Sequence, residues 1–195
     1  MKGFCISLDV SKGSSFYQGF KGFDEPITKP KKIEHNLEGF KELLKLKDSI
    51  KKEYDSDCIV IFESTGIYHK ALQTYLDEHD FKYTIISPLL SAKVRKSDIR
   101  GTKTDAKDCS SIAKVFYYKL AWSYDKLKKY DLAKKAYERF LFNDNNIGKT
   151  NYGWAWYSYG NLYYYGEGVP VNKTKAKEMF RNAVKYGYEN AKKYI

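Results

Sequence analysis

The chain is poor in the residues that build disulfide and zinc frameworks. It holds 3 cysteines, 3 histidines and 4 prolines among 195 residues. The cysteines form no CxxC pair and their number is odd, so neither a disulfide framework nor a zinc site is expected. Cys5 and Cys58 lie within apolar stretches, which predicts buried free thiols. The three histidines show no metal-ligand spacing, and we expect them on the surface or on helix faces.

Long hydrophobic runs are also missing. No apolar stretch approaches the ~18–20 residues that a membrane-spanning helix needs. The N-terminus enters strand-like sequence directly, with no apolar signal region and no small-residue cleavage site. These absences argue against a membrane partner, and we expect a cytoplasmic protein.

Acidic residues are outnumbered by basic ones, and the imbalance is uneven along the chain. The net charge is +11, which favours polyanionic partners. Residues 1–116 carry +3 of this charge, whereas residues 117–195 carry +8 and hold 14 of the 19 tyrosines. This change in composition predicts a domain boundary near residue 117.

The pattern of residues 1–116 predicts an α/β domain. Expected strands cover residues 4–10, 14–23, 31–34, 58–62 and 83–86. Expected helices cover residues 37–54, with Asn36 as N-cap, and residues 66–79, 89–96 and 104–116. Because residues 112–124 contain no glycine or proline, the last helix has the option of running past residue 116. A strand hairpin followed by alternating helices and strands is typical of an RNase H-like layout.

Four acids stand at the ends of these elements. Asp9 and Glu63 close two predicted strands, while Asp105 and Asp108 are three residues apart and share one face of a predicted helix. If the two strands are parallel, their acids lie at one edge of the sheet. Carboxylate oxygens suit hard cations, and two such cations about 3.5–4 Å apart clamp both oxygens of a phosphodiester displacement. Taken singly, each acid also fits a plainer role at a strand end or in a first helical turn.

Three motifs together resemble a known family. They are Leu8–Lys12 (LDVSK), Phe62–Gly66 (FESTG) and Lys103–Asp108 (KTDAKD). In order and spacing they resemble the DEDD transposases of bacterial insertion sequences, which have a RuvC-like N-terminal domain. The resemblance covers roughly residues 3–116 and includes Ser87-Pro88. It implies Mg²⁺, with Mn²⁺ as a second candidate, and DNA strand cleavage and exchange. It implies a metal-binding catalytic tetrad of Asp9, Glu63, Asp105 and Asp108, a structured RNA partner and an oligomer.

A basic segment precedes the last two acids. Its residues are Lys93, Arg95, Lys96, Arg100 and Lys103. They are candidates for neutralising DNA phosphates near the metals. The alternative is a solvated basic helix and loop with no ligand.

Residues 117–195 predict helical repeats. Ala121, Tyr124, Ala133 and Tyr137 follow tetratricopeptide spacing, and the stretch from Ala155 to Ala191 resembles the SEL-type variant. Such repeats bind proteins or peptides rather than catalyse. The aromatic cluster around Trp154 and Tyr163 is compatible with base stacking, but packing between helices is the preferred interpretation.

The second half departs from the transposase pattern. Family members continue into a long helical segment and a domain with a catalytic serine, which residues 117–195 do not resemble. The leading hypothesis is a truncated DEDD transposase domain fused to short helical repeats, with metal-dependent DNA processing but incomplete transposition. The alternative is a non-catalytic adaptor whose repeats bind a protein.

Overall fold

The computed structural model describes residues 3–64, 66–89, 105–142 and 153–195. These residues form two compact units, one ending at Phe116 and the other beginning at Tyr117. Helix α4 (Asp105–Lys126) contributes residues to both units. No helix in the described ranges is long and apolar enough to cross a membrane.

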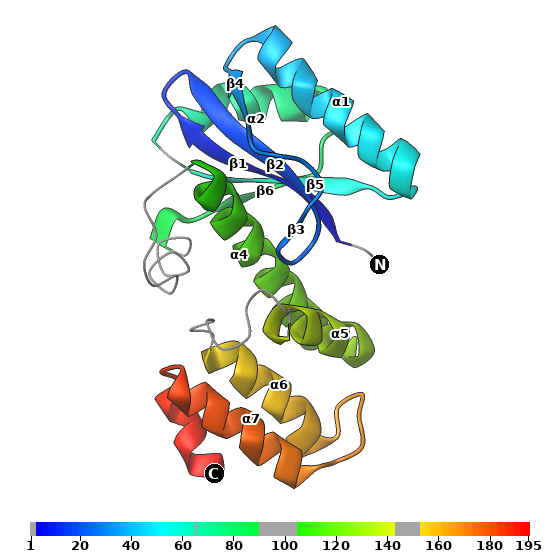
Figure 1. Cartoon of the computed structure of the whole chain (residues 1–195), viewed down its shortest axis with the longest axis vertical. Coiled ribbons are helices and arrows are strands. Elements are labelled where there is room, and N and C mark those ends of the chain that lie inside the picture. The colour runs from blue at the N-terminus through cyan, green and yellow to red at the C-terminus, as the bar shows by residue number, and fades with distance from the viewer. Residues whose placement is uncertain (1–2, 65, 90–104, 143–152) are drawn as a thin grey trace. The chain divides into compact units, whose positions relative to one another are not determined.

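A mixed sheet forms the centre of the first unit (Figure 1). Its strands are β1 (Phe4–Ser11), β2 (Ser14–Gly22), β3 (Glu25–Pro26), β4 (Lys31–Glu34), β5 (Cys58–Glu63) and β6 (Tyr83–Ile86). The strand order is β3-β2-β1-β5-β6, and β4 also pairs with β2. β1 pairs antiparallel with β2 and parallel with β5, while β6 runs parallel to β5. The turn between β1 and β2 requires Gly13, whose φ of +76° favours glycine.

The helices of the first unit follow the predicted pattern with two differences. α1 (Leu37–Tyr54) begins where expected, because the Asn36 side chain accepts a hydrogen bond from the Gly39 amide at 2.8 Å. α2 (His69–Glu78) begins three residues later than predicted, since Gly66 has a left-handed φ of +52°. α4 does not end at Phe116 but continues to Lys126. The helix predicted over residues 89–96 lies almost wholly outside the described residues.

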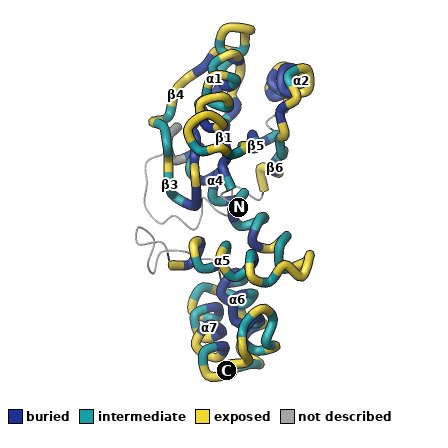
Figure 2. Tube along the Cα trace, turned by 90° about the vertical axis from the view of Figure 1, so that its right-hand side faces the viewer, coloured by how far each residue is buried: buried dark blue, intermediate teal, exposed yellow. Residues whose placement is uncertain are grey.

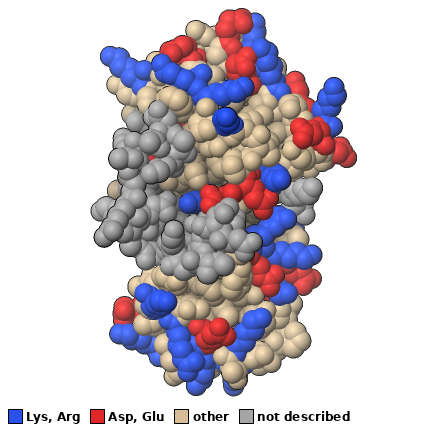
Figure 3. Space-filling model, in the orientation of Figure 1, with Lys and Arg blue, Asp and Glu red and all other residues tan. Residues whose placement is uncertain are grey.

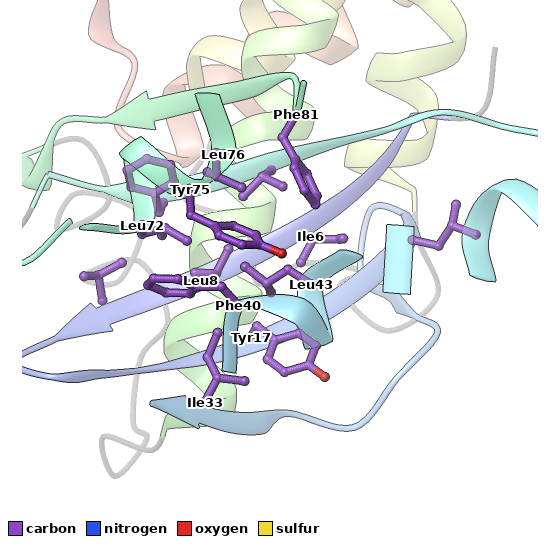
Figure 4. Packing of buried hydrophobic residues seen from close by; sticks show 14 of the residues in the cluster. Ile6, Leu8, Tyr17, Ile33, Phe40, Leu43, Leu72, Tyr75, Leu76 and Phe81 are labelled. Atoms are coloured by element: carbon purple, nitrogen blue, oxygen red, sulfur yellow. The ribbon is translucent and has the colours of Figure 1, made fainter. Parts of the chain in front are cut away.

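Alternation along the central strands gives the sheet two different faces. One face packs against α1 and α2 and carries the apolar cluster shown in Figure 4. Ile6 and Leu8 of β1 lie in this cluster, as does Phe62 of β5. Because successive side chains of a strand point to opposite faces, Ser7, Asp9 and Glu63 belong to the other face. The sheet therefore separates the main core from the face that carries the acids.

The second unit is helical in its described residues. It holds the end of α4, then α5 (Tyr130–Leu141), α6 (Gly153–Tyr165), α7 (Lys173–Lys185) and a short 3₁₀ helix, η2 (Glu189–Tyr194). Both α6 and α7 carry buried residues (Figure 2). The two helices approach closely at Gly160, where a Cβ atom would stand 2.8 Å from the Phe180 ring. Trp154 packs against the ring of Phe140, with centroids 6.0 Å apart, which favours packing over base stacking for this residue.

Candidate functional site

Two of the four acids lie side by side at one edge of the sheet. The parallel register of β1 and β5 runs from Phe4 opposite Cys58 to Leu8 opposite Phe62. Asp9 and Glu63 are the next residues on each strand, so they stand at the same level at the carboxyl edge. Neighbouring strands are about 4.8 Å apart, which brings the two Cα atoms close together.

The same two acids also share a face. Leu8 and Phe62 precede them and belong to the cluster under α1 and α2. One residue further along, each side chain emerges on the opposite face, where α4 packs. Glu63 is only 5 % exposed, and Asp9 is half-buried. The carboxyl edge therefore carries one buried acid, Glu63, and one partly exposed acid, Asp9.

The first turns of α4 are attached to this face through side chains. The Cys109 thiol donates a hydrogen bond to the carbonyl of Phe16 at 3.4 Å, and Phe16 is the antiparallel partner of Asp9. The Ser110 hydroxyl donates to Asp24 Oδ1, also at 3.4 Å. Asp108 directly precedes Cys109 and is 4 % exposed. The third acid is thereby brought to the face that carries Asp9 and Glu63.

Electrostatics at Cys109 also report this proximity. The pKa of the Cys109 thiol is raised to about 12, chiefly by burial, and the negative charges of Asp9 and Asp108 contribute to this rise. Hydrogen bonds from the Asp9 backbone and the Ser7 side chain act in the opposite direction. The Cys109 thiol interacts electrostatically with both acids and with the backbone of Asp9, so Asp9 and Asp108 lie near each other.

Part of the predicted site lies outside the described residues. Asp105 begins α4, but its side chain is not among those described. The basic residues Lys93, Arg95, Lys96, Arg100 and Lys103 fall in the undescribed range 90–104. Among the side chains that are described, no three His, Cys, Asp or Glu residues stand close enough to hold a metal ion. A metal site built on the four acids thus remains a prediction.

The role of Cys109 in holding α4 against the sheet was not predicted from the sequence. The spacing of residues 105, 108, 109 and 112 indicates such a role, because these positions lie on one face of a helix. Cys109 and Ile112 are both fully buried on that face. The face of α4 that carries Asp108 is therefore the one that packs on the sheet.

Basic charge on the visible surface is dispersed. On the face shown in Figure 3, lysine and arginine side chains are interspersed with aspartates and glutamates. Among the described residues on that face, the basic side chains do not form one continuous patch.

The sheet, its covering helices and the acids at its carboxyl edge indicate a structural class of protein. A mixed α/β sheet with helices is compatible with a RuvC-like domain, the nuclease architecture of DNA-processing enzymes. The sequence matches the family model of the IS110-type DEDD transposases, described as a transposase, over residues 6–138. The chain belongs to this transposase family, and its function class is DNA transposition and recombination. Transposases of this family bind DNA and generally depend on divalent metal ions. No curated protein matched the chain.

The match extends further than the motifs indicated. It continues past Phe116, through the rest of α4 and into α5. The segment with tetratricopeptide-like spacing, from Ala121 to Tyr137, therefore lies within the transposase match.

Proposed function

We propose that the edge of the sheet that carries Asp9 and Glu63, called the acid edge below, is a metal-dependent centre for cleaving DNA phosphodiesters. Asp9, Glu63, Asp105 and Asp108 are the proposed ligands, for Mg²⁺ first and for Mn²⁺ as a substitute. The observation that supports this most directly is the shared edge and face of Asp9 and Glu63, on which α4 is anchored.

The chemistry of the donor set fits a hard divalent cation. All four side chains offer carboxylate oxygens, the ligands that Mg²⁺ and Mn²⁺ prefer. Two of the acids sit on adjacent strands, whose backbone hydrogen bonds hold them in a fixed relation. The other two sit on a helix, three residues apart, so one face presents both.

The chain's own residues prepare this site for phosphoryl transfer. Bound divalent ions activate water or a hydroxyl group and stabilise the leaving oxygen. Burial of Glu63 and Asp108 keeps bulk water away, which strengthens electrostatic interactions at the edge. Lys93, Arg95, Lys96, Arg100 and Lys103 are proposed to neutralise phosphates of the bound DNA.

Further partners follow from the family and from the second unit. A structured RNA and a homo-oligomer are proposed because the DEDD transposases use both. The domain division is proposed as a RuvC-like domain in residues 1–116 and helical repeats in residues 117–195. The close approach of α6 and α7 at Gly160 supports a repeat-like pair in the second part. A protein or peptide is the proposed partner of that pair.

A cleavage assay on branched and linear DNA tests the proposed centre. Asp9→Ala should abolish cleavage in Mg²⁺ or Mn²⁺, because it removes one ligand from a rigid strand end. Asp57→Ala is the matched control, since Asp57 is an exposed acid just before β5, at the opposite end of that strand. Equal cleavage by wild type and Asp9→Ala, both with native melting temperatures, would refute the assignment.

A further inference from the structure

Three exposed apolar residues follow the ends of β5 and β6, beside the edge that carries Asp9 and Glu63. Ile67 and Leu89 are each 78 % exposed, and Tyr68 is 39 % exposed. In the described part of the first unit, they are three of the four exposed large hydrophobic residues, the fourth being Leu37. Scattered exposed hydrophobics are ordinary, but a concentration at one edge marks a contact surface.

Two neighbouring loops carry these side chains. Ile67 and Tyr68 follow β5, and Leu89 follows β6. Glu63 lies opposite Ile86 in the parallel register, and the Ser64 amide donates to the Ile86 carbonyl at 3.2 Å. Ile67 is four residues beyond Glu63 and Leu89 three beyond Ile86, so each lies within about 14 Å of that pair.

The tip of the β5–α2 loop is held by its own backbone. Gly66 turns the chain with a φ of +52°, and the Lys70 amide donates to the Ile67 carbonyl at 3.1 Å. Tyr68 stands at the N-cap of α2, yet its side chain makes no capping hydrogen bond. The Tyr68 side chain is therefore exposed and does not cap the helix.

The chemistry of these side chains suits nucleobases rather than phosphates. A phosphodiester held at Glu63 brings its flanking bases with it, since successive nucleotides of one strand rise about 3.4 Å. Aromatic rings stack on bases with little sequence preference, and apolar side chains wedge between base steps. Lys70, which is exposed and follows this tip, adds a positive charge for the adjoining backbone.

We infer that Ile67, Tyr68 and Leu89 form an apolar rim that contacts unstacked bases of the DNA beside the cleaved phosphodiester. The inference rests on the proposed cleavage centre, because that centre places the DNA at this edge. The occupant of the rim is the DNA substrate itself.

A cycle of base removal and side-chain removal tests the rim. Single abasic nucleotides are placed in turn at the four positions on each side of the mapped cut. Binding of the full chain is measured in Ca²⁺, and cleavage in Mg²⁺. For wild type, an abasic nucleotide at a contacted position should weaken binding about tenfold. In Tyr68→Ala and Ile67→Ala, binding to intact DNA should already be weaker, and the abasic nucleotide should cost nothing more.

Two further variants separate base contact from a folding effect. Tyr68→Phe keeps the ring and should keep the sensitivity to base removal. Leu127→Ala removes an exposed leucine from the second unit, 64 % exposed, and should behave as wild type.

Each remaining outcome has a defined meaning. Rim variants with wild-type affinity and wild-type sensitivity to abasic DNA overturn the rim, as does a change of oligomeric state in those variants. If Asp9→Ala still abolishes cleavage in that case, the proposed centre stands alone. If Asp9→Ala cleaves as wild type, the proposed centre fails, and the rim as defined here fails with it.

Discussion

At the scale of single residues, Cys109 joins the helix that carries Asp108 to β2, the strand paired with the one that carries Asp9. Its thiol donates to the carbonyl of Phe16, and Phe16 pairs with Asp9 across the hairpin. The side chain is fully buried, so its volume sets how closely α4 approaches the sheet. A change of size at this position is expected to move Asp108 relative to Asp9.

The first prediction concerns that volume. Cys109→Leu should overpack the interface and lower the free energy of unfolding by about 1–3 kcal/mol. It should also raise the Mg²⁺ concentration needed for cleavage. Cys109→Ala leaves α4 in place and should need less additional Mg²⁺ than Cys109→Leu. Urea unfolding and metal titrations of cleavage are the measurements, and an unchanged Mg²⁺ requirement in Cys109→Leu would contradict the positioning role.

The second prediction concerns the reactivity of the Cys58 thiol. Burial raises the pKa of Cys58 to about 11, and the nucleophile in alkylation is the thiolate. At pH 8.5 an unfolded cysteine, with a pKa of ~8.5, is about half ionised, whereas Cys58 is ionised to well under one per cent. Alkylation of native Cys58 at this pH should therefore be roughly a hundredfold slower than in urea.

The rate for Cys58 should rise steadily as the pH approaches 11, because the thiolate fraction rises with it. Iodoacetamide labelling followed by peptide mass spectrometry reads each cysteine separately. Equal rates in native and unfolded protein would show that Cys58 is not shielded as described.

At the scale of elements, periodicity predicted most of the sheet and the first helix. Alternating and apolar runs located β1, β2, β4, β5 and β6, and Asn36 located the start of α1. The two-residue β3 was missed, since Glu25–Pro26 has no strand pattern and pairs only through its neighbour β2. The start of α2 was misplaced because the backbone angle of Gly66 cannot be seen in a hydrophobic pattern.

For the candidate site, the sequence indicated which residues to consider but not how the fold brings them together. Strand ends and the three-residue spacing of Asp105 and Asp108 identified the acids. The shared edge of Asp9 and Glu63 needed the parallel register of β1 and β5, which no local pattern specifies. The anchoring contact of Cys109 with Phe16 joins residues far apart in the sequence, so only the folded chain reveals it.

The third prediction belongs to the packing of α6 on α7. Gly160→Leu should force the helices apart, because even a Cβ at this position meets the Phe180 ring at 2.8 Å. A loss of about 1–3 kcal/mol in the free energy of unfolding is expected. Lys177→Leu places the same side chain at an exposed position of α7 and should change stability by less than about 0.5 kcal/mol. Similar stability of the two variants in urea unfolding would contradict the close approach.

At the scale of the whole molecule, one helix belongs to both compact units. α4 supplies Asp108 to the first unit and Ala121 to the second, without an interruption between them. The transposase match also runs across this helix, from residue 6 to residue 138. Residues 139–195 lie beyond the match and contain α6 and α7.

The fourth prediction concerns how far the reaction proceeds. We expect this polypeptide, supplied with DNA ends of its element and any associated RNA, to bind or nick DNA with little joined product. Strand exchange requires the cleaved end to be held and passed to a new partner, beyond the activation that metals provide. An excision-and-joining assay in cells, with Asp9→Ala as the inactive control, measures this. Efficient joined product from this polypeptide alone would contradict the prediction.

The register of the central strands also has a kinetic consequence. β1 finds β2 through a tight turn, but its other neighbour, β5, is made only after the whole of α1. Pairings between distant segments form slowly, and an unpaired strand edge invites association with other chains. During synthesis, β1 therefore emerges as an open edge until Cys58–Glu63 arrives to cover it. Asp9 and Glu63 meet only in that closing step, so the proposed cleavage centre cannot assemble before this edge of β1 is covered.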